Sequence, residues 1–231
     1  MKSEMNNGDS ALEPDSPEDN QFLSDEWTSE AGALIEVSID PSSWHSPLIA
    51  DLKKRGPVML DHIASRLSLD PQMVSLLLCN DVDMRSMNFL HRGFDKSTNV
   101  LSFPAGDDLY PNDDMPEMDG GIGDIAIAGE TVMREAAEAG IAAGDHLLHL
   151  FTHGVLHLLG YDHIDDQMAD EMEALEIALL GQMKIANPYL DDELVPYLAD
   201  LGFECETFPN PRADAGPFLV AKRIEGDDLP T

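Results

Sequence analysis

One stretch of the chain decides how its fold is interpreted: HGVLHLLGYDH, which runs from His153 to His163. Two histidines four residues apart on a helix, His153 and His157, project from one face and can reach the same metal ion. Gly160 suits the end of that helix, because glycine adopts at little cost the positive φ that turns the chain back. The turn can bring His163 beneath the same face as a third ligand. Three histidine nitrogens leave one coordination position open for water, which is typical of catalytic zinc.

The spacing equals that of the metzincin proteases, H-E-x-x-H-x-x-G-x-x-H, except at the second position. In those proteases the glutamate is the general base that takes a proton from water. Gly154 occupies this position and has no side chain that could do so. The motif therefore favours a zinc hydrolase with a substrate other than peptides, and a zinc peptidase or amidase is kept as an alternative.

Two residues beside the ligands are candidates for supporting roles. Asp162 adjoins His163 and is suited to hold the turn or to orient a ligand, more than to act as a fourth ligand. His149 lies on the same helical stripe as His153 and is a candidate to support a ligand or to line a substrate groove. A simple polar edge of the helix explains His149 equally well.

The amino-acid composition of the chain restricts the partners that it can bind. The 45 acidic and 13 basic residues give a net charge of −32, which argues against non-specific binding to nucleic acid. Any RNA contact therefore needs a local basic patch. The two cysteines fit a reducing cytosol, and no apolar run approaches the roughly 18–20 residues of a membrane span. We expect a cytoplasmic protein that acts away from membranes.

The chain divides into one domain and two tails. Residues 1–32 are acidic and rich in polar residues, and we expect them to form a disordered tail. Residues 33–203 are expected to form a single zinc hydrolase domain, and residues 204–231 a flexible, proline-bearing extension.

Periodicity within the domain predicts an α+β fold in which helices pack on a small mixed sheet of four strands. The apolar runs predict these strands at Leu34–Ile39, Val74–Cys79, Val100–Phe103 and Gly123–Ala128. One helix is predicted to begin near Pro57, and three more are predicted at 81–90, 130–139 and 192–201. A further predicted helix carries the first two histidines and has its N-cap at Asp145, and another follows Asp165. The histidine helix is apolar almost all round, so we expect the zinc site on a buried helix.

A second informative stretch runs from Met84 to Pro104. It contains three basic residues and one acidic residue (3 − 1 = +2), a positive segment in an acidic chain. Arg92 within it is suited to phosphate because its planar guanidinium donates two parallel hydrogen bonds, although a solvated surface arginine is the commoner case. Phe89 and Phe94 are candidates to stack on bases, whereas Phe103 suits the core.

Three motifs in this order resemble a known family. They are N-x3-R-G-x-D-K-x-T-N-V-L-S-F-P from Asn88 to Pro104, G-D-I-x-I from Gly123 to Ile127, and H-G-x-L-H-L-L-G-Y-D-H from His153 to His163. Together they resemble the YbeY family of bacterial endoribonucleases and ribosomal RNA maturation factors, over about residues 35–189. The resemblance implies a single-domain, zinc-dependent hydrolase that cleaves single-stranded RNA.

The resemblance also implies roles for residues and partners. His153, His157 and His163 would hold one zinc ion per chain, and Arg92 would be the family's functional arginine, contacting the phosphate. The family's roles are maturation of the 3′ end of small-subunit ribosomal RNA, wider ribosomal RNA processing and quality control of defective ribosomes. Expected partners are single-stranded RNA, ribosomal RNA and ribosomal particles, with a ribosomal protein or a GTPase as a further candidate.

The sequence leaves the nucleophile and the general base open. A 2′,3′-cyclic phosphate product would indicate attack by the RNA 2′-OH, whereas 3′-OH and 5′-phosphate ends would indicate attack by water. A third functional class is also open, a non-catalytic ribosome-biogenesis factor in which zinc is structural.

Overall fold

The computed structural model describes residues 22–106, 121–186 and 188–189, and the backbone of 203–208 and 218–223. Residues 1–21 of the predicted tail, the acidic segment 107–119 and the predicted helix 192–201 lie outside the described residues. Within the described helices, none is long and apolar enough to cross a membrane.

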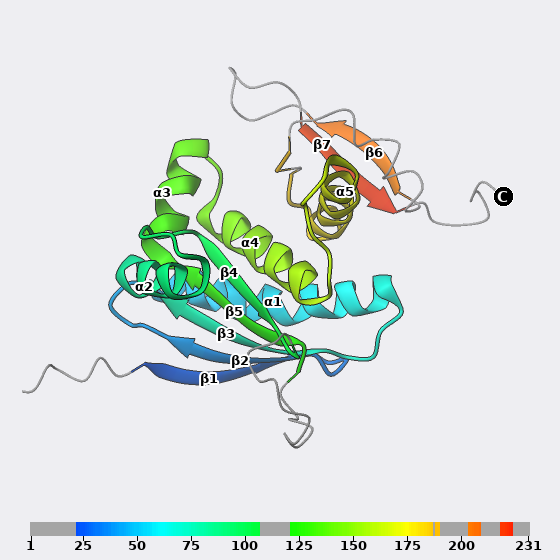
Figure 1. The fold of residues 1–231 in the computed structure, drawn as a ribbon. Helices are drawn as coiled ribbons and strands as arrows, with labels where there is room; N and C mark the ends of the chain where they lie inside the picture. The colour runs from blue at the N-terminus through cyan, green and yellow to red at the C-terminus, as the bar shows by residue number, and fades with distance from the viewer. Residues whose placement is uncertain (1–21, 107–120, 187, 190–202, 209–217, 224–231) are drawn as a thin grey trace, which may run out of the picture.

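A mixed sheet of five strands forms the centre of the molecule, in the order β1-β2-β3-β5-β4 (Figure 1). The central strands β2, β3 and β5 run parallel, and the edge strands β1 and β4 pair antiparallel with their neighbours. The strands are β1 (Leu23–Thr28), β2 (Leu34–Ile39), β3 (Met73–Cys79), β4 (Val100–Pro104) and β5 (Gly123–Ala128).

Helices cover the two faces of this sheet unequally (Figure 1). α1 and α4 pack on one face, α2 packs on the other, and α5 lies beside α4 and α1. The helices are α1 (Ser46–Leu67), α2 (Asp81–Arg92), α3 (Gly129–Ala139), α4 (Ala143–Leu158) and α5 (Asp166–Gln182). The predicted α+β class, with its mixed sheet and packed helices, is confirmed.

Alternation along the strands produces the main core. In β2 and β3 every second side chain is buried against α1 and α4, and the register pairs Ile35 with Val74 and Val37 with Leu76. α4 contributes buried residues around most of its circumference, including Leu148, Phe151 and Val155. The helix that carries the histidines is therefore fixed by packing on several sides, as predicted.

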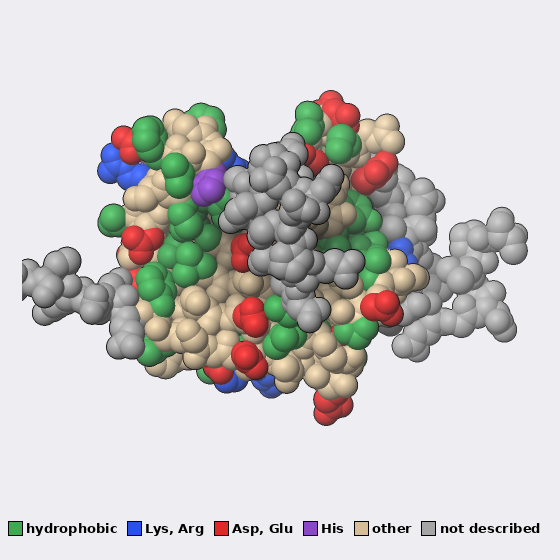
Figure 2. Space-filling view, turned by 60° about the horizontal axis from the view of Figure 1, so that its bottom comes forward, with side chains coloured by type: hydrophobic (Ala, Val, Ile, Leu, Met, Phe, Trp, Pro, Cys, Tyr) green, Lys and Arg blue, Asp and Glu red, His purple; other side chains and the backbone are tan. Residues whose placement is uncertain are grey.

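The opposite face of the sheet is only partly covered. α2 packs there over Leu101 and Ala126, and a groove of about 970 Å³ remains beside it. The carboxylates of Asp25, Glu36 and Asp124 line this groove. Figure 2 shows the molecule with this side turned forward, and acidic side chains lie there among hydrophobic ones.

The sheet has one strand more than the four predicted. The additional strand, β1, lies inside the segment 1–32 that was predicted to be disordered. That prediction is wrong for Leu23–Thr28, which pairs with β2 along its whole length. The strand has one buried side chain, Trp27, which is 1% exposed and packs in the main core. One large aromatic side chain and a complete hydrogen-bond ladder thus offset a composition typical of a tail.

Three further expectations change, at the C-terminus, in α1 and at the start of α4. The extension 204–231, predicted to be flexible, contains an antiparallel pair, β6 (Phe203–Phe208) and β7 (Phe218–Arg223), with β7 beside α5. Pro57 lies inside α1 and not at its start, because buried residues on both sides, such as Leu52 and Leu60, hold the helix together through it. The N-cap of α4 is Ala142, and Asp145 instead accepts a hydrogen bond from Arg55.

Replacing Trp27 tests whether β1 belongs to the domain. We expect Trp27→Ala to lower the free energy of unfolding by about 3–5 kcal/mol, because the change leaves a cavity in the core. Leu23→Ala on the same strand should change it by less than about 0.5 kcal/mol, since Leu23 is 55% exposed. Denaturant unfolding of both variants measures this, and equal small effects would show that β1 does not stabilise the fold.

Candidate metal centre

The structure brings the three motif histidines together. His153 and His157 project from the last turns of α4, and His163 follows in the segment after the helix. The nitrogens of the three rings lie within 4.8 Å of one another. Gly160 has φ of +89°, and the Tyr161 N–H donates to Leu156 O at 3.0 Å, so the chain reverses under α4 as the motif predicts.

Hydrogen bonds set the orientation of two of the rings. His153 Nδ1 lies 2.8 Å from Glu176 Oε1, and His157 Nδ1 lies 2.9 Å from the carbonyl oxygen of Tyr161. Both partners accept, so each Nδ1 carries the proton and each Nε2 presents a lone pair. The two Nε2 atoms are 3.0 Å apart. Two lone pairs at that distance repel each other unless a cation lies between them, so this donor set fits a metal ion.

Glu176 is a functional residue that sequence reasoning missed. It lies on α5, its side chain is fully buried, and it accepts hydrogen bonds from His153, His149 and Tyr189. Burial alone would raise the pKa of Glu176, but the hydrogen bonds from His149 and His153 outweigh burial and lower the pKa to about 2. The carboxylate is therefore ionised, and its charge makes His153 a better ligand. An acidic residue inside the apolar run ALEIALL was the available signal.

The two predicted supporting residues lie close to the ligands. His149 Nε2 donates to Glu176 Oε2 at 2.7 Å, so it reaches His153 through that carboxylate and not directly. Asp162 Oδ1 accepts from the backbone N–H of His163 at 2.8 Å. Asp162 therefore holds the turn that presents His163.

The position that holds glutamate in metzincins faces the sheet. A Cβ atom on Gly154 would lie 3.1 Å from two atoms of Ile125 and 3.2 Å from the Ser102 hydroxyl. These contacts are tight, and Gly154 is buried. A carboxylate at this position would therefore require Ile125 and Ser102 to shift.

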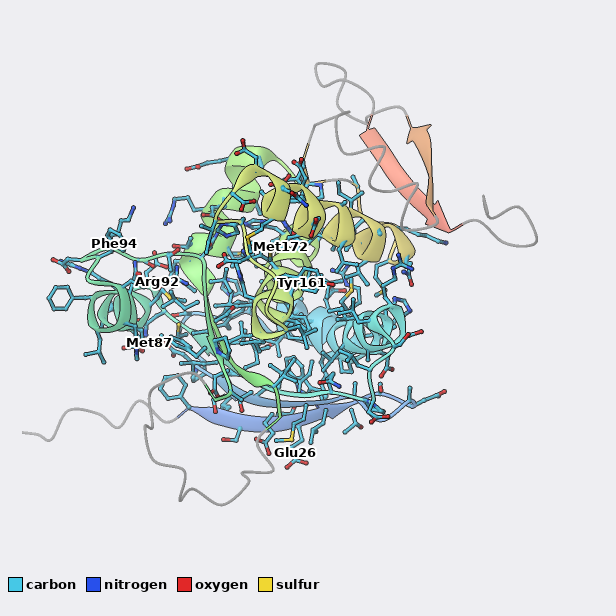
Figure 3. The ribbon with its side chains drawn as sticks, turned by 45° about the vertical axis from the view of Figure 1, so that its right-hand side comes forward. Glu26, Met87, Arg92, Phe94, Tyr161 and Met172 are labelled. Atoms are coloured by element: carbon cyan, nitrogen blue, oxygen red, sulfur yellow. The ribbon has the colours of Figure 1, made fainter. Side chains whose placement is uncertain are left out.

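The histidines open into a pocket of about 570 Å³. Arg92, at the C-terminal end of α2, lines the same pocket, together with Thr98 and Asn99 from the segment before β4 and Ser102 from β4 itself. Figure 3 labels Arg92 and Tyr161, which lie on two sides of this pocket. Within the described part of the chain Arg92 forms no ion pair, so its guanidinium is available to an anion beside the histidines.

The three aromatic candidates separate into two groups. Phe89 and Phe94 are 59% and 58% exposed, whereas Phe103 is partly buried and packs its ring edge-on against His91, with ring centres 4.8 Å apart. Phe103 supports the smaller core under α2, as the sequence suggested.

The fold is that of a mixed α/β protein. Its buried helix α4 presents a three-histidine group that could hold a metal ion, and an arginine lines the same open pocket. The model of the family described as Endoribonuclease YbeY matches residues 46–184. The chain belongs to this family.

The chain is similar to individual proteins along part of its length. An Endoribonuclease YbeY of Rhodospirillum rubrum is 52% identical over 123 residues, which cover 52% of this chain and 60% of that protein. One of Allorhizobium ampelinum is 40% identical over 162 residues, 67% of this chain and 93% of the relative. A solution structure from Thermotoga maritima matches 64% of this chain and 91% of its own at 25% identity, with a TM-score of 0.38.

Removing the charge of Glu176 tests its support of the ligands. We expect Glu176→Gln to weaken Zn²⁺ binding by about 10–100-fold, because an amide neither carries the charge nor accepts as many hydrogen bonds. Competition with a chromophoric chelator measures the affinity. Glu171→Gln, an exposed position on the same helix, is the control and should bind Zn²⁺ as the wild type does. Equal affinities in all three proteins would rule out the role of Glu176.

Proposed function

We propose that this chain is a zinc-dependent endoribonuclease that cleaves single-stranded RNA. The observation that carries the proposal is the shared pocket, in which the Arg92 guanidinium faces the three-histidine group without a carboxylate partner among the described residues. The names of its relatives, which are called endoribonucleases, support the same reaction.

Zinc is the ion we assign to the site. Imidazole nitrogen is a common zinc donor, and three protein ligands leave one position open to solvent or substrate. Neither cysteine adjoins the histidines in the sequence, and Cys79 is buried in the smaller core. When bound, zinc would act as a Lewis acid towards the phosphate and would lower the pKa of water.

Arg92 would bind the scissile phosphodiester. Its guanidinium can donate two parallel hydrogen bonds to the non-bridging oxygens and can stabilise the charge that grows on them. Thr98 and Asn99 line the same wall and offer neutral polar groups beside it. Arg92 ends α2, and Thr98 and Asn99 directly precede β4, so the phosphate would be positioned against α4 by groups at the ends of regular elements.

A single-stranded substrate fits the shape of the site. The pocket is recessed between α2, β4 and α4, so a strand must leave its duplex to place one phosphodiester inside. The exposed ring of Phe94 beside Arg92 offers a surface on which an unpaired base can stack.

We propose ribosomal RNA as the cellular substrate, at the 3′ end of the small-subunit RNA and in defective ribosomes, in the cytoplasm. The net charge of −32 opposes binding of free RNA at a distance. Recruitment to a ribosomal particle, by a ribosomal protein or a GTPase, would overcome this repulsion by raising the local concentration of substrate.

Gly154 weighs against the peptidase alternative. The only carboxylate that lines the metal pocket within the described residues is Asp162, which accepts from the His163 N–H. A general base at the metzincin position is absent, because Gly154 has no side chain, and Ile125 packs tightly against it.

Two substitutions test the proposal. We expect Arg92→Ala to lower cleavage of single-stranded RNA by at least about a hundredfold while Zn²⁺ binding is retained, because the phosphate loses its charged partner. His153→Ala should abolish both cleavage and tight Zn²⁺ binding. Lys54→Ala, which removes an exposed charge on α1, should change neither. Gel-resolved cleavage by the zinc-loaded chain, with and without ribosomal particles, measures the activity.

The outcomes separate the three classes of function. Absence of RNA cleavage by the zinc-loaded wild type, with proteolysis of an unfolded protein, would establish the peptidase. RNA binding without cleavage, and unfolding on zinc removal, would establish the non-catalytic factor. The ends of the RNA products distinguish attack by the 2′-OH from attack by water.

A further inference from the structure

A second cavity adjoins the metal pocket. It has a volume of about 390 Å³ and shares Arg92, Thr98 and Asn99 with the metal pocket. Its remaining wall comes from the loop after α2 and from α3, with Phe94, Lys96, Arg134 and Glu135 among the lining residues. Arg92 therefore lines both cavities.

This second cavity, which we call the adjacent basic pocket, is positive in a strongly acidic chain. Arg92, Lys96 and Arg134 line it, against the single carboxylate of Glu135. Glu135 is already engaged, because it accepts from Asn99 Nδ2 at 3.1 Å and lies 2.8 Å from His146 Nε2. Three cations around one occupied carboxylate favour an anionic ligand.

The cations of this pocket are accessible to a ligand. The Lys96 ammonium forms no ion pair in the described part of the chain. Arg134 is half exposed, and its guanidinium lies 3.5 Å from the carboxylate of Asp81, at the limit of a hydrogen bond. A phosphate with shorter contacts can displace so long an interaction.

The loop that carries Phe94 and Lys96 is held in place before any ligand arrives. Asn88, which is 3% exposed, donates its side-chain N–H to the carbonyl oxygen of Lys96 at 2.8 Å. Arg85 and Asp95 close the loop through two hydrogen bonds of 2.6 and 2.9 Å. The conformational entropy of ordering this loop is therefore not lost on binding.

Phe94 gives the pocket an aromatic edge. Its side chain is 58% exposed although it lines the cavity, and nothing in the described core covers it. An exposed phenyl ring beside cations is the combination that binds single-stranded nucleic acid, through stacking and phosphate contacts together.

We propose that the adjacent basic pocket binds the nucleotide next to the scissile phosphodiester, with its phosphate at Lys96 and Arg134 and its base on Phe94. The inference rests on the proposed ribonuclease function and extends it from one phosphodiester to at least two. The enzyme then requires a strand with a phosphate beyond the cleaved one, which a dinucleoside monophosphate lacks.

Substrates of two lengths test this. In the full-length, zinc-loaded chain, Lys96→Ala and Arg134→Ala should each lower kcat/KM about tenfold on a single-stranded hexanucleotide and leave it unchanged on a dinucleoside monophosphate. Each should also reduce the slope of log binding constant against log salt by about 0.7. Arg134→Lys should restore both values, and Lys54→Ala controls for the loss of one charge elsewhere.

Phe94 has a matched control on α2. Phe94→Ala should weaken binding of a labelled 2′-O-methyl hexanucleotide by about five- to a hundredfold, whereas Phe89→Ala, equally exposed but outside both pockets, should not. Fluorescence anisotropy reports binding and needs no cleavage, so it tests the pocket even if the wild type cuts no RNA. Absence of cleavage by the wild type would overturn the proposed function and would leave this test of the pocket intact. Equal effects on both substrate lengths, or none, would overturn the inference.

Discussion

The hydrogen bond from His153 Nδ1 to the buried carboxylate of Glu176 is the interaction on which the site depends. It fixes the proton on one nitrogen and points the lone pair of the other towards His157. Since Glu176 is fully buried and also accepts from His149 and Tyr189, it joins α4, α5 and the segment after α5 in one network. The packing of α4 against the sheet matters because it fixes the position of this hydrogen-bond network relative to Arg92.

Positive charge is concentrated around the site, although the chain as a whole is strongly negative. A net charge of −32 would exclude RNA from most of the surface, yet Arg92, Lys96 and Arg134 gather around two joined pockets. If the chain binds RNA as proposed, the acidic surface elsewhere would favour binding at these two pockets, where the cations lie beside the three-histidine group.

Much of this arrangement could be predicted from the sequence, because local patterns carry it. Apolar runs predicted four of the strands, and the spacing of His153, His157 and His163 around Gly160 predicted a shared metal site. β1 was missed because its stability comes from pairing with β2 and from a single buried side chain, Trp27. Glu176 was missed because its partners lie 23 and 27 residues away, a contact that only tertiary packing creates.

X-ray absorption at the zinc edge of the zinc-loaded, full-length chain tests the central claim most directly. Three imidazole nitrogens at about 2.0–2.1 Å, with one further oxygen ligand from solvent, are the result expected for an open three-histidine centre. A sulfur ligand, or fewer than three imidazoles, would contradict the assignment of His153, His157 and His163 and with it the account of the pocket.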